Sequence, residues 1–351
     1  MQSRCATSIR RPLPMKRRLI FIFVYIVFVC GLVTLAATAY WQIRSSPATS
    51  GRTDEESIWL YYYGELKQSG DYDAESSLDD ESFDVLLLGA SVLEQVANEL
   101  ETRLHERLGG NVRVFNLARS AHTSRDSFLK YKQLTSQQFD VVVMYHGIND
   151  TRMNCCPQSE FKDDYTHCYW YRGMKRRVAA GRLSLAGLIQ DDMQSLIPLG
   201  EPEPESLDLG RTIKTGPAFR ANLEGVVHGA KDSAQPVLMM TFAYHVPGNY
   251  SRTQFEAGRL DYGPGKHQLP IELWGRPDNV ARTIDVHNGI VDELASKNDH
   301  VVLVDQHSLM PKDGEHFSDP CHLTEAGVTR FVENMLPAIV DRWESAMQSR
   351  Q

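Results

Sequence analysis

A serine, an asparagine, an aspartate and a histidine occupy positions where they could form a catalytic site. Ser91 follows the apolar run FDVLLLGA, Asn149 follows the run FDVVVMYHGI, and Asp319 precedes His322 by three residues in the segment DPCH. A carboxylate three residues before a histidine at a turn can orient the imidazole, which can then take the proton of a serine hydroxyl. The side-chain amide of Asn149 could donate to an oxyanion. These residue types in this order favour nucleophilic acyl transfer.

Five apolar runs of strand length are separated by amphipathic stretches, a pattern typical of a parallel sheet covered by helices. The expected strands span residues 83–91, 111–118, 139–147, 236–245 and 300–308, and the expected helices span 92–108, 124–137, 217–232, 279–297 and 324–347. In an open parallel sheet the reactive groups collect at the carboxyl ends of the strands, where the helices begin. We therefore expect a three-layer α/β/α fold with a five-stranded parallel, flavodoxin-like sheet.

Residues 19–41 form one uncharged stretch of 23 residues. At about 1.5 Å per residue, a helix of this length spans the roughly 30 Å hydrocarbon layer of a bilayer. Six basic residues and no acidic residue precede the stretch, so the positive-inside rule predicts a cytoplasmic basic tail (1–18), a single transmembrane anchor, and a domain outside the cytoplasm. The alternative is a secreted protein with a cleaved signal peptide, because Ala37-Thr38-Ala39 resembles a cleavage site. Both alternatives export the remainder of the chain.

The exported part divides into a polar linker and one large domain. Residues 42–82 are rich in serine and acidic residues, which is typical of a stalk, and the apolar segment 59–64 predicts one docking helix or strand within it. Residues 83–347 hold the predicted sheet, with insertions at about 150–216 and 246–278. Insertions of this length usually build the substrate side of a site.

Charge is distributed unevenly along the chain. The whole sequence has 37 Lys+Arg and 45 Asp+Glu, a net charge of −8. Because residues 1–41 hold six basic residues and no acidic residue, residues 42–351 hold 31 basic and 45 acidic residues, a net charge of −14. This balance argues against nucleic-acid binding and favours neutral or cationic substrates over polyanions.

The motifs together resemble the SGNH (GDSL-type) hydrolase superfamily over about residues 83–345. In that family four sequence blocks supply a nucleophilic serine, a glycine, an asparagine, and a histidine with an aspartate three residues before it. Ser91, Asn149 and the pair Asp319 and His322 match three of these blocks closely. The resemblance implies a triad of Ser91, His322 and Asp319. It also implies an oxyanion hole made by the amides of Ser91 and the second-block residue together with the Asn149 side chain.

Two positions depart from the family pattern. Ala90 stands where the first block has the aspartate of the GDSL name, but that aspartate is not the partner of the catalytic base. The second block, residues 116–121, lacks its glycine, and Ala121 is the best counterpart. An alanine amide can donate to an oxyanion as a glycine amide does, provided that its backbone avoids positive φ.

The resemblance implies a two-step acyl transfer, in which Ser91 attacks an ester carbonyl with His322 as base and water resolves the acyl-enzyme. The expected function is therefore a membrane-anchored serine esterase outside the cytoplasm. Its substrate would be an acylated carbohydrate or another envelope or secreted ester, and we expect no cofactor or metal. Two alternatives stay open: an O-acyltransferase that passes the acyl group to a glycan, and a non-catalytic domain that binds a glycan or a protein.

Three further residues are candidates for substrate binding. Arg119 and Arg152 lie close in sequence to the second and third blocks, where they could bind an anionic group. His146 ends the third predicted strand and could line the same cleft.

Four cysteines lie in the exported part, where oxidation is expected: Cys155, Cys156, Cys168 and Cys321. The segment after Asn149 and the loop before His322 must converge at the site. We therefore expect one disulfide from Cys155 or Cys156 to Cys321, with the other closing on Cys168. The alternative is a zinc site that also uses His167, although the spacing is not a standard zinc pattern.

Overall fold

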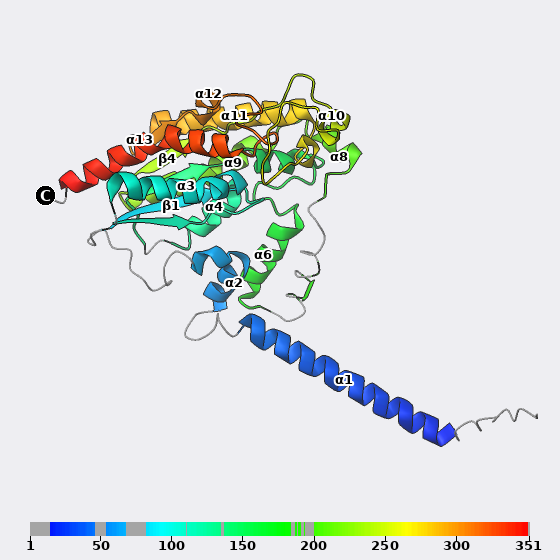
Figure 1. Cartoon of the computed structure of the whole chain (residues 1–351). Helices are drawn as coiled ribbons and strands as arrows, with labels where there is room; N and C mark the ends of the chain where they lie inside the picture. The colour runs from blue at the N-terminus through cyan, green and yellow to red at the C-terminus, as the bar shows by residue number, and fades with distance from the viewer. Residues whose placement is uncertain are drawn as a thin grey trace, which may run out of the picture.

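The computed structural model describes residues 15–45, 54–67, 82–109, 111–134, 137–183 and 200–349, together with residues 187, 189, 190 and 193. Most of the expected cytoplasmic tail and much of the expected stalk, residues 1–14, 46–53 and 68–81, lie outside the described residues. The described part consists of one N-terminal helix and an α/β domain (Figure 1).

A parallel sheet forms the centre of the α/β domain. Its strands are β1 (Phe83–Gly89), β2 (Val112–Asn116), β3 (Val141–Tyr145), β4 (Val237–Met240) and β5 (Val301–Val304). All four pairings are parallel, and the order β2-β1-β3-β4-β5 confirms the predicted five-stranded sheet. After β2 is added on one side of β1, the next strand, β3, is added on the other side of β1, so the order of connection reverses between β1 and β3. In open α/β sheets the ligand crevice lies beyond the carboxyl ends of the strands at this point.

Helices cover both faces of the sheet, as predicted (Figure 1). One face packs against α3 (Ser91–Leu108) and α13 (Glu325–Ser349), in a core that includes Leu87, Leu100 and Phe331. The other face packs against α4 (Ser124–Tyr131) and α9 (Thr215–Asp232), in a core that includes Leu86 and Phe219. The long helix α11 (Pro277–Lys297) contributes residues to both cores.

Helix α4 begins at the predicted residue but ends early, at Tyr131 instead of residue 137. A capping box fixes its start. The Thr123 side chain accepts from the helix backbone, and the Asp126 side chain accepts from the Thr123 amide at 2.8 Å. This start lies immediately after the loop that carries Ala121.

The apolar segment of the expected stalk is part of the folded domain. Helix α2 (Asp54–Tyr62) and the 3-10 turn η1 (Gly64–Lys67) bury Ile58, Tyr63 and Leu66 completely. These side chains share a core with Leu86 of β1. In Figure 1, α2 lies beside α6 (Tyr169–Ala180). The domain therefore includes residues ahead of the predicted boundary at residue 83.

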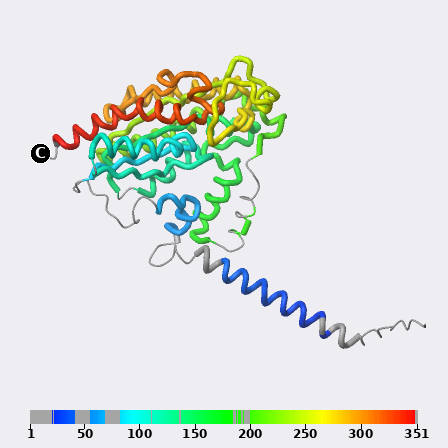
Figure 2. The backbone as a smooth tube through the Cα atoms, viewed as in Figure 1, coloured from blue at the N-terminus to red at the C-terminus, as the bar shows by residue number. Residues whose placement is uncertain are grey.

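Helix α1 (Met15–Ser45) contains the segment Ile22–Tyr40, which is long and apolar enough to cross a membrane. None of this segment is buried against the rest of the described chain, and Figure 2 shows its backbone standing apart from the domain. An exposed helix that is apolar all round is typical of a membrane anchor or of a signal sequence. The segment is one of these two.

The insertions contain short helices joined by irregular segments. The first holds α5 (Ile148–Thr151), η2 (Arg152–Asn154), α6 and α8 (Pro204–Leu209), and the second holds α10 (Arg252–Glu256) and η3 (Ile271–Leu273). A further short helix, α12 (Gln306–Leu309), follows β5.

Candidate active site

Ser91, His322 and Asp319 lie in hydrogen-bond contact. Nε2 of His322 is 2.8 Å from Oγ of Ser91, and its Nδ1 is 2.7 Å from Oδ2 of Asp319. Because a carboxylate only accepts, Nδ1 carries the proton and Nε2 presents its lone pair to the serine hydroxyl. In this arrangement an imidazole can deprotonate a serine and later protonate a leaving group.

Ser91 lies at a sharp turn from β1 into α3. It is the first residue of the helix, directly after the extended residue Ala90. A Cβ on Gly89 would come within 2.7 Å of the Leu93 side chain and 3.1 Å of the Tyr145 carbonyl oxygen, so the turn requires glycine there. The first amides of a helix lack intrahelical acceptors, and the helix dipole favours negative charge beside them. The Ser91 amide can therefore donate to an oxyanion.

Asp319 is held by four N–H groups. Its Oδ1 accepts from the amides of Cys321 and His322 at 2.9 and 2.8 Å. Its Oδ2 accepts from the Leu269 amide at 2.9 Å as well as from the His322 ring. Leu269 belongs to the second insertion, so this insertion contacts Asp319 directly and helps to keep the carboxylate in one orientation.

Ala121 lies in the loop between β2 and α4 and is exposed. Its φ of 65° places it in the left-handed region, so the condition that its backbone avoid positive φ is not met. Glycine enters this region without a steric penalty, whereas a Cβ costs about 1 to 2 kcal/mol. The loop thus turns in the way that glycine favours, and alanine adopts the turn under strain. The strain comes from the Cβ, and the amide N–H keeps the direction that a glycine amide would have, so it can still donate and the expected condition on φ is wrong.

Both polar atoms of the Asn149 side chain are engaged. Nδ2 donates to the His122 carbonyl at 2.9 Å, and Oδ1 accepts from Nε1 of Trp274 at 2.8 Å. Because the indole nitrogen only donates, the orientation of the amide is determined. The bond to His122 uses one of the two hydrogens on Nδ2, and the other can be donated to an oxyanion.

The candidate substrate-binding residues contact the protein itself. His146 is buried with Nε2 2.7 Å from Oγ of Ser127, and burial lowers its pKa to about 3, so the ring is neutral. Arg119 donates to the Ala118 carbonyl at 2.6 Å, and Arg152 donates to the Gly200 carbonyl at 2.6 Å. His146 therefore supports the interior of the domain, and substrate binding by the two arginines stays a prediction.

The predicted disulfides are wrong, because the four cysteines concerned are free thiols: Cys155, Cys156, Cys168 and Cys321. Sγ of Cys321 lies in the core, 3.5 Å from Nδ1 of His322, whereas Sγ of Cys155 is 3.7 Å from the Trp274 carbonyl. Sγ of Cys168 contacts the Met153 sulfur at 3.3 Å. The loops do converge on the site, but these side chains have different neighbours.

The zinc alternative also lacks its predicted ligand cluster. Within the described ranges, the residues whose donor atoms lie close enough to share a metal ion are Asp319, Cys321 and His322. Cys155, Cys156, His167 and Cys168 do not form such a group there. Both ring nitrogens of His322 are already hydrogen-bonded, to Asp319 and to Ser91, so this group overlaps the predicted triad.

Two aromatic residues of the second insertion at the site were not identified from sequence. The His267 ring lies 4.5 Å from the His322 ring between centroids, at an interplanar angle of 34°. Burial lowers the pKa of His267. Trp274 orients Asn149 as described above. Both residues lie in a segment rich in Gly and Pro that has no helical or strand periodicity, so only the length of the insertion indicated a role.

The chain is similar in structure to two solved ester hydrolases. A GDSL-like lipase from Bacteroides thetaiotaomicron VPI-5482 shares 13% identity at a TM-score of 0.46, over 81% of this chain and 98% of that one. An acetylxylan esterase from Geobacillus stearothermophilus shares 16% identity at a TM-score of 0.42, over 73% of this chain and 94% of that one. No protein-family model and no curated protein sequence matches the chain. At these identities the likeness concerns the fold.

Proposed function

We propose that the protein is a serine esterase of the SGNH (GDSL-type) superfamily, with Ser91 as nucleophile, His322 as general base and Asp319 as its orienting carboxylate. The observation that carries this proposal is the pair of hydrogen bonds, 2.8 and 2.7 Å long, that joins the three side chains. Ser91 and His322 are 231 residues apart in sequence, so the fold brings them together.

The proposed reaction has two steps. Oγ of Ser91 attacks the ester carbonyl while Nε2 of His322 takes its proton, and the amides of Ser91 and Ala121 with Nδ2 of Asn149 stabilise the oxyanion. The tetrahedral intermediate then expels the alcohol, which receives the proton from His322. A water molecule, activated by the same imidazole, hydrolyses the acyl-enzyme and regenerates Ser91.

The proposed substrate is an acylated carbohydrate or another envelope ester outside the cytoplasm. Support for this location comes from α1, which we propose is a retained anchor with the α/β domain on the exported side. The net charge of −14 on residues 42–351 disfavours polyanions, so neutral or cationic short-chain esters are the first substrates to assay.

A fluorophosphonate probe tests the nucleophile without knowledge of the substrate. We expect the full-length protein to be labelled and Ser91→Ala to lose both labelling and turnover of a short acyl ester while its thermal midpoint stays the same. Ser251→Ala, which changes an exposed serine of the second insertion, should remain labelled and serves as the control. Undiminished turnover by Ser91→Ala would falsify the assignment.

The products distinguish hydrolysis from acyl transfer. With an acyl donor and an oligosaccharide acceptor, an esterase releases the free acid, whereas a transferase forms an acylated sugar. Labelling that depends on Ser91 would exclude the non-catalytic alternative.

A further inference from the structure

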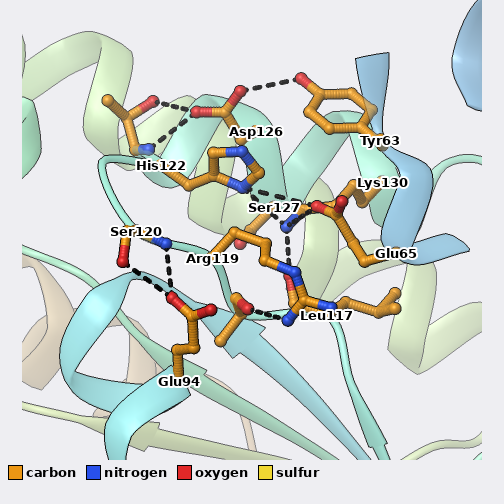
Figure 3. Close-up of polar contacts among 12 residues, drawn as sticks. Tyr63, Glu65, Glu94, Leu117, Arg119, Ser120, His122, Asp126, Ser127 and Lys130 are labelled. Atoms are coloured by element: carbon orange, nitrogen blue, oxygen red, sulfur yellow. Dashed lines mark hydrogen bonds and ion pairs between the residues drawn. The ribbon is translucent and has the colours of Figure 1, made fainter. Parts of the chain in front are cut away.

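A buried ion pair lies beside the loop that carries Ala121 (Figure 3). Nζ of Lys130, on α4, is 3.2 Å from Oε1 of Glu65, on η1. Lys130 is completely buried and Glu65 is 7% exposed. Removing two such charges from water costs several kcal/mol each, so a buried pair is weak evidence for stability and calls for another explanation.

Lys130 bridges the two ends of this loop, residues 117–122. Its ammonium donates to the Leu117 carbonyl and to Nδ1 of His122, the latter at 3.0 Å. Because an ammonium group only donates, Nδ1 of His122 is the acceptor and the ring proton lies on Nε2. Burial, and then the charge of Lys130, lower the pKa of His122 to about 4, which agrees with a neutral ring.

The same loop is attached to two other parts of the candidate site. Glu94, one turn after Ser91 on α3, accepts from the amide and hydroxyl of Ser120 at 2.7 and 2.8 Å. The His122 carbonyl accepts from Nδ2 of Asn149. Figure 3 shows Glu94 and Lys130 reaching the loop from different elements. A shift of the loop would therefore move the Ala121 amide and release Asn149 together.

The partner of Lys130 comes from residues 54–67, the part of the domain that precedes the predicted boundary at residue 83. Glu65 follows α2, whose burial in the core places η1 against α4. The Tyr63 hydroxyl also donates to Oδ1 of Asp126 at 2.9 Å, and Asp126 caps α4 directly after the loop. Residues 54–67 thus contact the loop's supporting helix through two separate polar interactions.

We propose that Lys130 and Glu65 are positioning residues for the oxyanion hole, and that the segment 54–67 is in this way part of the catalytic unit. The ion pair holds loop 117–122 so that the Ala121 amide and the Asn149 side chain face the carbonyl attacked by Ser91. This inference rests on the proposed function, because it assumes that these groups stabilise an oxyanion.

The test replaces the pair with neutral side chains of similar shape, Lys130→Met with Glu65→Gln, in the full-length protein. We expect kcat on a short acyl ester to fall about 10- to 100-fold with KM unchanged, since misplacing a catalytic group by 1 Å can cost about 100-fold. Glu65→Gln alone keeps an oxygen that accepts from Lys130 and should lower kcat by less than the double variant does. Hydrogen exchange of residues 117–122 should be faster in the double variant than in the wild type.

Tyr131→Phe is the matched control. It removes the hydroxyl bond to Gln235 at 3.1 Å, on the same helix as Lys130, and should leave kcat unchanged. If the double variant does not fold, His122→Phe carries the test, because it removes one of the two contacts between Lys130 and the loop and leaves the ion pair and the bond to the Leu117 carbonyl in place. Either variant, folded and with wild-type kcat and wild-type exchange of the loop, would overturn the inference.

The exchange measurement separates this inference from the proposed function. Faster exchange of the loop in the variants of a protein whose Ser91 is never labelled would show that the ion pair holds the loop, but it would defeat the esterase assignment and with it the role in an oxyanion hole. A labelled wild type with variants that raise KM alone would support the esterase and defeat the positioning role.

Discussion

The strained backbone of Ala121 makes a quantitative prediction for Ala121→Gly. A Cβ at φ 65° costs about 1 to 2 kcal/mol in the folded state, and glycine avoids this cost. Glycine also gives the unfolded chain more freedom, which lowers stability by about 0.5 to 1 kcal/mol. The variant should therefore raise the free energy of unfolding by about 0.5 to 1 kcal/mol, or the thermal midpoint by about 1 to 4 °C for a domain of this size.

Turnover should be unchanged by this substitution. Ala121 is exposed, so the lost methyl group leaves no cavity in the core. The contacts that hold the loop, from Glu94 to Ser120 and from Lys130 to His122, do not involve the Ala121 side chain. The backbone amide thus keeps its direction while the strain is removed.

Thermal and urea unfolding of three alanine-to-glycine variants provides the assay. Ala234 is also exposed with a positive φ of 56°, and Ala234→Gly should show the same gain. Ala257 is exposed with φ −81°, so Ala257→Gly should instead lose about 0.5 to 1 kcal/mol. A lower midpoint for Ala121→Gly beside a higher one for Ala234→Gly would refute the reasoning about strain.

Three further predictions concern single side chains. Asp319→Asn should lower kcat about 1,000- to 10,000-fold in steady-state assays, because an amide favours the wrong tautomer of His322; a loss below tenfold would contradict the triad. Trp274→Phe removes the N–H that orients Asn149 and should lower kcat by less than the roughly 100-fold typical of a lost oxyanion donor, with KM unchanged; an effect on KM alone would argue against this role. The folded pKa of His146, about 3, lies below its ordinary 6.5, so its contribution to stability is complete above pH 6.5 and is lost as the pH falls toward 3. Urea titrations between about pH 6 and pH 4 give the free energy of unfolding as a function of pH. Its slope should be smaller in His146→Gln than in the wild type by about 1.4 kcal/mol per pH unit, and equal slopes in the two proteins would disprove the prediction.

The sequence by itself determined the sheet and the order of the catalytic candidates. Strands buried on both faces are mostly apolar, so β3 appears as an uninterrupted apolar run in the chain and β1 as a run that only Asp84 interrupts. Because parallel strands end at one edge, Ser91 and Asn149, which follow these two runs, are expected to meet there. The Asp319-x-x-His322 spacing and the resemblance to the SGNH family add His322, whose Nε2 lies 2.8 Å from Oγ of Ser91. The apolar runs and the spacing of Asp319 and His322 both involve residues that are close in sequence, so both can be recognised without the structure.

Tertiary structure alone decided the partners of the remaining polar groups. Trp274 reaches Asn149 across 125 residues and Glu65 reaches Lys130 across 65, and neither pair has a local pattern. The same holds for Cys321, whose thiol lies against His322 instead of another cysteine, and for Ala121, whose left-handed backbone depends on the contacts that hold its loop. A polar group in the interior must find a hydrogen-bond partner, but the folded arrangement of distant segments determines which partner is within reach.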